Sequence, residues 1–366
     1  MWCPLPWIHQ FITTNTVKTC CNGKVNGPAL PSDFANSDVL KDIKQTILND
    51  KTHYNCVGCA NIEKQGYTSI RQEAIRDYPF YTAKNIPDVI EYVDLRYNNL
   101  CNFSCRTCEP AFSSSIAKET EQQPVLKKYH KPAALINSFE SVSEDIFKFL
   151  PTLKKVNFTG GEPLLIKDNL KIMERLVELK KFNCEILITT NCSVYNHQWD
   201  DMLSKFKKVH WTLSIDGVEQ YAEYIRHGTK WKEVDKNIRT IVQLGHSVAF
   251  NTTVSAYSIL NIDKLVKYYL EIEQLATGPI ELWFHLCQHP GYLNPGVLNG
   301  ESAEKAKASI TVAIQMLNQS TSKHSNGISL LENVYKNLNT TDLNTKFLEF
   351  TKDLDTIRNQ NFQTLL

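Results

Sequence analysis

The sequence predicts an α/β fold built on a parallel sheet, arranged as a partial barrel of six strand–helix units. Between residue 90 and about residue 290, strand-like stretches alternate with stretches of helical periodicity. Parallel strands need long crossover connections, which are usually helices, so this alternation favours a parallel sheet. Six units rather than eight indicate an open barrel. The predicted strands cover residues 92–97, 155–159, 185–190, 209–215, 248–254 and 280–286.

Helices are expected where apolar residues recur at spacings of three and four. Within the barrel, these stripes are Leu170, Met173 and Val177 in one helix, and Trp231, Val234, Ile238 and Ile241 in another. After residue 290 the chain reads as helical, with Ser302 as the expected cap of a helix whose stripe is Ala306, Ile310, Ala313 and Leu317. Three domains are therefore expected: 1–88, cysteine-rich; 89–290, the partial barrel; and 291–366, a helical extension.

The charges of the 366-residue chain are balanced, with 40 Lys and Arg against 39 Asp and Glu. This balance gives no overall field that would attract nucleic acid or an anionic membrane. The sequence has no run of 18 apolar residues and begins without the basic segment of a signal peptide. A cytoplasmic protein is expected, so its 11 cysteines indicate metal or redox chemistry rather than a disulfide framework.

Three of these cysteines, Cys101, Cys105 and Cys108, lie on one short segment directly after the first predicted strand. Cubane iron–sulfur clusters are normally held by four thiolates. A tight loop whose cysteines are separated by three and by two residues reaches only three corners of the cube. The next cysteine, Cys184, falls in another predicted strand. One iron would then be open to a small molecule, as the open position of a catalytic zinc site is open to water.

This C-x3-C-x2-C loop after a strand resembles that of the radical SAM superfamily. The resemblance implies a [4Fe-4S] cluster whose open iron binds S-adenosylmethionine (SAM), with Cys101, Cys105 and Cys108 as both cluster ligands and catalytic residues. One-electron reduction, from a flavodoxin- or ferredoxin-type donor, would then yield a 5′-deoxyadenosyl radical that abstracts hydrogen from a substrate. The alternative is a zinc-binding interaction module on an inactive barrel, although zinc prefers paired C-x2-C clips.

The second predicted strand ends in Gly160, Gly161, Glu162 and Pro163. Two glycines allow the backbone to approach a ligand closely, and Pro163 stiffens the exit from the turn. An ordinary βα turn would have the same composition. In its place one strand after the cysteine loop, the segment is similar to the radical SAM Gly-Gly-Glu motif, which implies that it holds the amino group of SAM.

Later strands end in polar residues, as ligand-facing strands of a barrel do. The resemblance implies that Asn191, Ser214, Asp216 and Arg226 bind SAM, with Ser214 and Arg226 at its carboxylate and Asp216 at its ribose. Asp216 could instead belong to a turn and Arg226 to the surface. Asn251 is a weaker candidate for adenine contact. Many family members have an aromatic residue before the third cysteine, where this chain has Thr107, so adenine stacking from that position is not expected.

A second cysteine set lies in the N-terminal segment: Cys3, Cys20, Cys21, Cys56 and Cys59. A hairpin through residues 14–15 precedes the vicinal pair, and a helix capped by Ser37 precedes the C-x2-C clip. The pattern resembles the twitch and SPASM auxiliary-cluster domains, although these usually follow the barrel. This resemblance implies an auxiliary iron–sulfur cluster held by Cys3, Cys20, Cys56 and Cys59, with Cys21 as the alternate. Four thiolates with such a clip also suit zinc, which stays open as the alternative metal.

The remaining cysteines, Cys184, Cys192 and Cys287, lie in or beside predicted strands and read as buried small hydrophobes. Cys287 ends the sixth strand and could face a substrate cavity. The auxiliary domain and the Ser214–Gly217 strand end resemble the peptide-modifying branch of the superfamily. A peptide or protein side chain is therefore the expected substrate.

Overall fold

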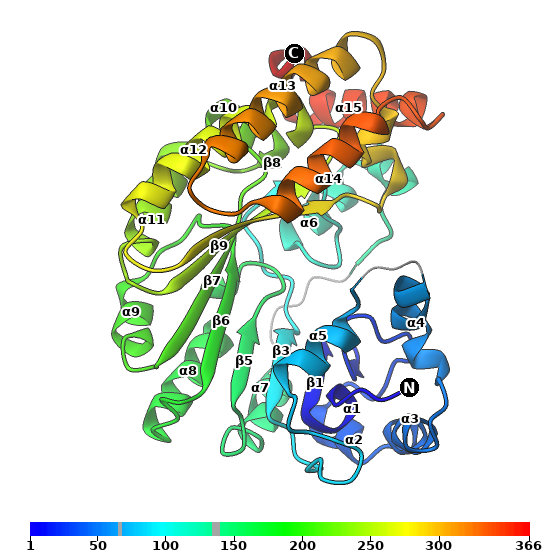
Figure 1. Ribbon diagram of the computed structural model, residues 1–366, viewed down its shortest axis with the longest axis vertical. Coiled ribbons are helices and arrows are strands. Elements are labelled where there is room, and N and C mark those ends of the chain that lie inside the picture. Colours follow the sequence, from blue (N-terminus) through cyan, green and yellow to red (C-terminus); the bar gives the residue numbers. More distant parts are fainter. Residues whose placement is uncertain (65–67, 134–139) are drawn as a thin grey trace. The chain divides into compact units, whose positions relative to one another are not determined.

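The structure of the protein is a computed structural model with a mixed α/β fold, and it describes residues 1–64, 68–133 and 140–366 (Figure 1). The chain divides into two compact units. The first unit comprises Met1–Asn99, Ile136–Ile188 and Asn196–Val209. The second comprises Leu100–Leu135, Thr189–Tyr195 and His210–Leu366. The cysteine loop belongs to the second unit, whereas the Gly-Gly-Glu-Pro turn and the N-terminal cysteines belong to the first.

The first unit contains a sheet with the strand order β2-β1-β3-β5-β6. All neighbouring pairs are parallel except β1 with β2, which form an antiparallel hairpin. The strands are β1 (His9–Thr13), β2 (Val17–Lys18), β3 (Tyr92–Arg96), β5 (Lys155–Phe158) and β6 (Glu185–Thr190). Alternate residues of β6 are buried, as in a strand that packs one face on a core.

The helices of the first unit include three that succeed one another beside the strands: α7 (Glu140–Phe147), α8 (Lys167–Glu178) and α9 (His197–Leu203) (Figure 1). The others are α1 (Leu5–Ile8), α2 (Pro31–Ala35), α3 (Asp38–Leu48), α4 (Val57–Lys64) and α5 (Ile70–Asp77). Ser37 caps α3 by accepting a hydrogen bond from the Leu40 N–H, which confirms the predicted start of this helix.

The second unit contains the parallel strands β7 (Lys208–Ser214), β9 (Ser247–Val254) and β10 (Ile280–Leu286), in this order. A separate two-stranded ribbon pairs β4 (Ser104–Cys105) with β8 (Arg226–His227). The helices are α6 (Ser114–Gln122), α10 (Glu219–Ile225), α11 (Trp231–Ile241), α12 (Ile262–Leu275), α13 (Gly300–Gln319), α14 (Ser325–Lys336) and α15 (Asn344–Arg358). Helix α13 packs against α12 and α14, which places the C-terminal helices on the barrel helices of this unit (Figure 1).

All six strands predicted for the barrel are present, as β3, β5, β6, β7, β9 and β10. The expected N-terminal hairpin is also present, but its first strand additionally pairs in parallel with β3, from His9 beside Tyr92 to Thr13 beside Arg96. Residues of the cysteine-rich segment therefore extend the sheet of the first unit. The division into domains at residues 88 and 290 stays a prediction.

Two helical details differ from expectation. The buried stripe of α8 is Asn169, Ile172, Met173 and Leu176 rather than one through Leu170 and Val177. Buried Asn169 bonds to the Tyr97 hydroxyl and the Pro163 carbonyl, so a polar contact sets the rotation of this helix. Helix α13 starts at Gly300 after Asn299, so Ser302 lies in its first turn, while its predicted apolar stripe is buried as expected.

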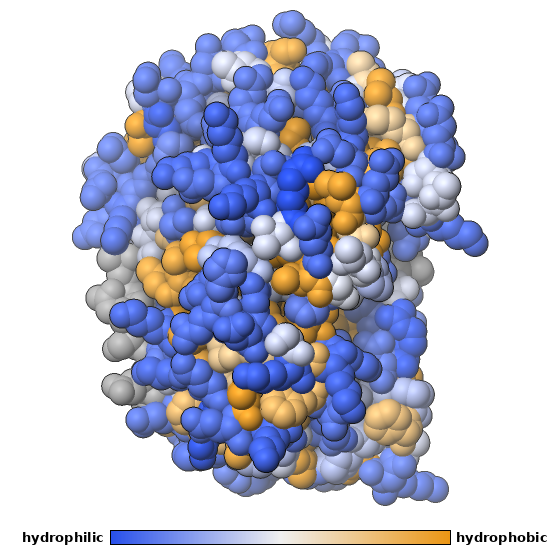
Figure 2. Space-filling model, turned by 90° about the vertical axis from the view of Figure 1, so that its left-hand side faces the viewer, coloured by the Kyte–Doolittle hydropathy of each residue, from blue (hydrophilic) through white to orange (hydrophobic). Residues whose placement is uncertain are grey.

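Figure 2 shows one face of the molecule, on which hydrophilic side chains predominate and apolar side chains form smaller groups between them. No helix among the described residues is both long enough and apolar enough to span a lipid bilayer.

Candidate functional site

The cysteine loop is fixed by the ribbon that it forms with β8. Ser104 pairs with His227 and Cys105 pairs with Arg226. Gly228 follows with φ of 100°, and a Cβ at that position would lie 2.9 Å from the carbonyl oxygen of Asn102. Only glycine allows the two segments to approach so closely with this backbone conformation.

Serines at the start of α6 hold the backbone of the first cysteine. The Cys101 N–H donates to the Ser114 hydroxyl at 3.1 Å, and the Ser115 hydroxyl donates to the Cys101 carbonyl at 2.7 Å. Ser113 caps α6 and donates to the carbonyl of Phe103 at 2.7 Å. The sequence analysis missed this role, which the three consecutive serines before an amphipathic stretch would have indicated.

Asn191, at the end of β6, lies against the same loop. Its side-chain nitrogen donates to Asn102 Oδ1 at 3.1 Å and lies 3.8 Å from the sulfur of Cys101. Asn102 in turn bonds to the Ser193 hydroxyl at 2.9 Å. The strand end predicted to face a ligand therefore contacts the cysteine loop itself.

The three thiols of the loop influence one another electrostatically. Burial, together with the neighbouring Cys105 and Cys101, raises the pKa of Cys108 to about 12. Burial also raises the pKa of Cys105, although the nearby Arg226 charge opposes this shift. Each thiolate would thus destabilise the next. The positive charge of bound metal ions offsets this repulsion and so favours the deprotonated, coordinating form of the thiols. The role of the three cysteines as cluster ligands stays a prediction.

Asp216 and Arg226 form a buried ion pair, with Arg226 Nη1 2.7 Å from Asp216 Oδ2. The other carboxylate oxygen accepts a hydrogen bond from the Thr253 N–H at 2.7 Å. Burial opposes the Arg226 charge, but Cys105 and Asp216 hold its pKa above the usual value. Neither residue belongs to an exposed turn or surface, and the ribose contact of Asp216 stays a prediction.

A small pocket beside this ion pair is lined by Phe103, Asn191, Ser214, Ile215, Gly217 and Arg226, among others. Ser214 pairs in register with Asn251 of the neighbouring strand. Among the described residues, Arg226 Nε and Asn251 Oδ1 are buried polar atoms that find no hydrogen-bond partner. Buried polar atoms are normally paired, so Arg226 Nε is a donor left for a bound group in this pocket, and Asn251 Oδ1 is an acceptor left on the neighbouring strand. The binding of SAM by Ser214 and Arg226 stays a prediction.

The Gly-Gly-Glu-Pro turn of the first unit closes on the end of β3. Gly160 has φ of 110°, and a Cβ there would lie 2.8 Å from the Asn98 carbonyl oxygen, which also accepts a hydrogen bond from the Gly161 N–H at 3.1 Å. Glu162 is fully buried, and its carboxylate accepts a hydrogen bond from the Leu164 N–H at 3.3 Å. Gly160 is therefore the glycine whose substitution the backbone excludes.

The N-terminal thiols of Cys3, Cys20, Cys56 and Cys59 are electrostatic neighbours. Burial raises the pKa of Cys3, and Cys20, Cys56 and Cys59 add to the shift. Burial likewise raises the pKa of Cys20 to about 12, with contributions from Cys21, Cys59 and Cys56. Cys20 packs with Cys3, Leu5 and Ala74. Cys21 is exposed, and its pKa is raised by partial desolvation and then by the Asp94 charge.

Arg71 supplies a positive charge beside this group, a role that the sequence analysis missed. It donates to the Trp2 carbonyl at 3.1 Å and is paired with Glu63, and its charge is favoured further by Cys3 and Cys59.

Within residues 1–64, 68–133 and 140–366, no three Cys, His, Asp or Glu side chains are grouped closely enough to hold a single metal ion.

The neighbouring vicinal cysteines allow a direct test of the N-terminal ligand set. Because Cys20 packs beside Cys3 and Cys21 is exposed, Cys20→Ser should lose the metal of this segment, about four iron atoms for a cubane. Cys21→Ser is the matched control and should keep full metal content. Metal analysis of anaerobically purified protein reads out both iron and zinc. Retention by Cys20→Ser with loss by Cys21→Ser would reverse the assignment.

The buried cysteines outside these two groups have local contacts. Cys184 and Cys192 are almost completely inaccessible, as expected for structural residues. The thiol of Cys287 lies 3.7 Å from the His289 carbonyl oxygen, and burial, followed by the Asp216 charge, raises its pKa to about 11. The orientation of Cys287 toward a substrate cavity stays a prediction.

Comparisons with known proteins point to one superfamily. Residues 95–260 match the family model described as the radical SAM superfamily. GTP 3′,8-cyclase of Campylobacter lari is 30% identical over 173 residues, which cover 45% of this chain and 47% of that protein. The radical SAM cyclopropyl synthase TigE of Paramaledivibacter caminithermalis is 27% identical over 176 residues, which cover 45% and 36%. The chain thus spans about half or less of the length of these relatives.

Distant structural likenesses accompany these matches. The structure of native anSMEcpe with bound AdoMet has a TM-score of 0.44 and 17% identity, and covers 65% of this chain and 62% of that one. Streptococcus suis SuiB bound to S-adenosylmethionine has a TM-score of 0.43 and 14% identity, and covers 78% and 61%.

Proposed function

Residues 95–260 are a radical SAM superfamily domain, and from this premise we propose that Cys101, Cys105 and Cys108 ligate its cluster in an enzyme that modifies a peptide or protein side chain. Enzymes of this superfamily use a [4Fe-4S] cluster and SAM. The observation that carries the ligand assignment is the electrostatic coupling of three thiols on one short loop inside the matched domain. When bound, the reduced cluster supplies the electron that cleaves SAM to a 5′-deoxyadenosyl radical.

The residues of the second unit would either hold the backbone of the cysteine loop in place or bind SAM. The serines at the start of α6 fix the backbone of Cys101, and the β4–β8 ribbon fixes that of Cys105. Ser214 and the unpartnered Arg226 Nε are proposed to bind the carboxylate of SAM, where a guanidinium suits an oxyanion. Asn251 Oδ1 offers an acceptor for the amino group of adenine, the weaker of the proposed contacts. In the first unit, the Gly160–Pro163 turn is proposed, from its sequence resemblance, to hold the amino group of SAM.

The N-terminal cysteines are proposed to hold an auxiliary iron–sulfur cluster. Two observations support this assignment. The four thiols Cys3, Cys20, Cys56 and Cys59 act on one another's pKa values, and the positive charge of Arg71 interacts with Cys3 and Cys59. A cation nearby favours thiolates, which are the form that binds metal.

The nature of the substrate is a finer proposal. The relatives are named for GTP cyclisation and for cyclopropyl synthesis. The balance of 40 Lys and Arg against 39 Asp and Glu gives no overall field that would attract a polyanion such as nucleic acid. Together with the resemblance of the Ser214–Gly217 strand end to peptide-modifying enzymes, this balance favours a peptide or protein, with reduction by a flavodoxin- or ferredoxin-type protein.

Reductive SAM cleavage tests this function. Reconstituted protein with dithionite and SAM under nitrogen should release 5′-deoxyadenosine and methionine, measured by chromatography. Gly160→Val should suppress the release, since a side chain there meets the Asn98 carbonyl. Gly245→Val is the matched control, because Gly245 also has positive φ but no atom within 4 Å of its Cβ position. A fully loaded wild-type protein that releases no 5′-deoxyadenosine would contradict the proposal.

The substrate class is tested in the same assay. Peptides deuterated at side-chain carbons should transfer deuterium to 5′-deoxyadenosine, which mass spectrometry detects. Transfer from deuterated GTP, with none from peptides, would instead assign a nucleotide substrate.

A further inference from the structure

We propose that the C-terminal helix α15 is a positioning element for the cysteine loop, and that it acts through a buried contact between Asp355 and Arg106. Arg106 lies between the second and third cysteines of the loop. The inference rests on the proposed function, since it gives the helical C-terminus a task at the loop that would hold the cluster.

Arg106 is 1% exposed, although arginine is rarely buried without partners. Its Nε donates to the Tyr224 carbonyl at 3.1 Å, and its Nη2 donates to Asp355 Oδ1 at 2.5 Å and Gln360 Oε1 at 2.9 Å. Its guanidinium also lies 3.8 Å from the centre of the Tyr224 ring. The cysteine loop itself supplies none of these contacts, so the buried charge depends on α10 and on the C-terminal segment.

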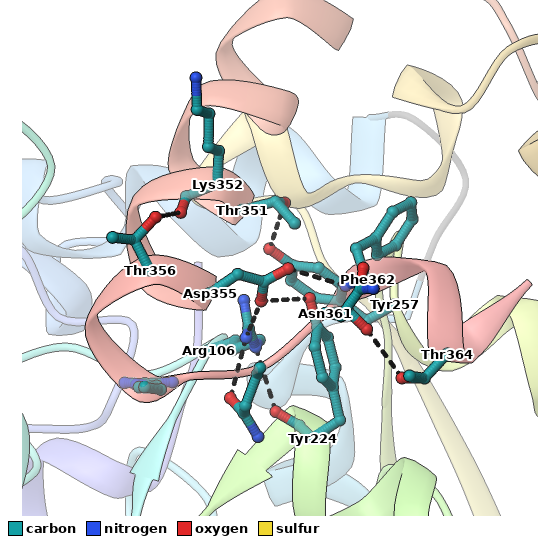
Figure 3. A network of polar contacts seen from close by, with 12 residues as sticks. Arg106, Tyr224, Tyr257, Thr351, Lys352, Asp355, Thr356, Asn361, Phe362 and Thr364 are labelled. Carbon is teal, nitrogen blue, oxygen red and sulfur yellow. Dashed lines mark hydrogen bonds and ion pairs between the residues drawn. The ribbon is translucent and has the colours of Figure 1, made fainter.

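Asp355 is the centre of this network, and Figure 3 shows it between Arg106, Tyr224 and Phe362. Besides Arg106, its Oδ1 accepts a hydrogen bond from the Tyr224 hydroxyl at 2.8 Å, and its Oδ2 accepts one from the Phe362 N–H at 2.7 Å. Both oxygens are therefore fixed in place, so the carboxylate can in turn fix the guanidinium in one orientation.

Two further contacts join α15 to the chain that follows the loop. Arg358 binds Glu119 of α6 through two hydrogen bonds of 2.9 and 2.7 Å, and its side chain is 3% exposed. Asp353 accepts a hydrogen bond from the Tyr129 hydroxyl at 2.7 Å and pairs with Lys128 at the same distance. Three charged residues of one helix thus hold successive parts of the segment from Arg106 to Tyr129.

Loss of the contact between Arg106 and Asp355 would disturb the backbone of the cysteine loop. The Arg106 N–H bonds to the Ile225 carbonyl at 2.9 Å, and Arg106 directly follows Cys105 in the β4–β8 ribbon. If the side chain loses its partner, it must move toward water, because an unpaired buried charge is strongly unfavourable. That movement would displace the backbone between Cys105 and Cys108 and thus change the spacing of two cluster ligands.

The test compares full-length Asp355→Asn with Lys352→Ala, a control on an exposed position of the same helix. In metal-free protein, amide hydrogen exchange of the segment 101–113 should be about tenfold faster in Asp355→Asn and unchanged in Lys352→Ala. In reconstituted protein, the electron paramagnetic resonance spectrum of the reduced loop cluster should change in Asp355→Asn, both without and with SAM. Unchanged exchange and an unchanged spectrum would overturn the proposal.

A second variant covers the case in which Asp355→Asn fails to fold. Arg106→Met combined with Asp355→Leu replaces the buried pair by apolar side chains of similar size, which is often tolerated. This double variant should fold, yet the amide hydrogens of its segment 101–113 should still exchange faster than those of the wild-type protein. Exchange at the wild-type rate would overturn the proposal. A wild-type protein that takes up no iron on the loop would refute the proposed function, while the exchange experiment would still decide the role of α15.

Discussion

Changing Cys101, Cys105 and Cys108 together to Ala should remove about four iron atoms per chain and abolish the release of 5′-deoxyadenosine. The reason is that these three thiols lie on one loop and influence one another's ionisation. The metal that the N-terminal cysteines are proposed to bind should remain, because these cysteines belong to the first unit. Iron per chain and chromatography of the reaction mixture measure both effects.

The control for this experiment changes Cys184 and Cys192 to Ala. Both are buried small side chains of strands or strand ends, so some stability is lost while the iron content stays that of wild type. If the triple variant also keeps full iron content, the loop does not hold a cluster and the proposed radical SAM chemistry must be abandoned.

Asp216→Ala should lower the free energy of unfolding by about 3–5 kcal/mol. The substitution leaves Arg226 buried with no carboxylate partner and also removes the acceptor of the Thr253 N–H. Urea denaturation followed by circular dichroism measures the loss. Glu233→Ala, which breaks an exposed ion pair with Lys230, is the matched control and should change stability by less than about 1 kcal/mol.

A double variant separates stability from ligand binding at this position. Arg226→Met with Asp216→Leu removes both charges and should recover much of the lost stability. It should still fail to bind SAM, because the proposed carboxylate contact of Arg226 is gone. An Asp216→Ala protein as stable as wild type would show that the ion pair does not hold this part of the second unit together.

The barrel strands could be predicted because their signal is local. In β6, for example, buried and partly exposed residues alternate along Glu185–Thr190, which is the pattern that a strand on a core imposes on its sequence. The parallel pairing of β1 with β3 could not be predicted in this way, since it joins His9 to Tyr92 across the whole cysteine-rich segment. The rotation of α8 was missed because Asn169 is buried by polar contacts, which an apolar stripe does not show.

In the candidate site, too, local motifs could be predicted from the sequence, whereas contacts between distant residues could not. The cysteine loop and the glycine turn have characteristic spacings, and sequence alone was sufficient to find them. The partners of these segments were not predictable, because the contact between Arg106 and Asp355 joins residues 249 positions apart. Likewise, the resemblance assigned Asp216 and Arg226 to a ligand, while the structure shows that they also bind each other.

The most direct test of the account is whether SAM binds the iron of the cysteine loop through its amino group. Electron–nuclear double resonance of the reduced protein with SAM labelled with ¹⁵N at that amino group measures this contact. The account predicts a ¹⁵N coupling in wild-type protein that is absent when Cys101, Cys105 and Cys108 are changed to Ala. Bound SAM with no ¹⁵N coupling in the fully loaded wild-type protein would contradict it.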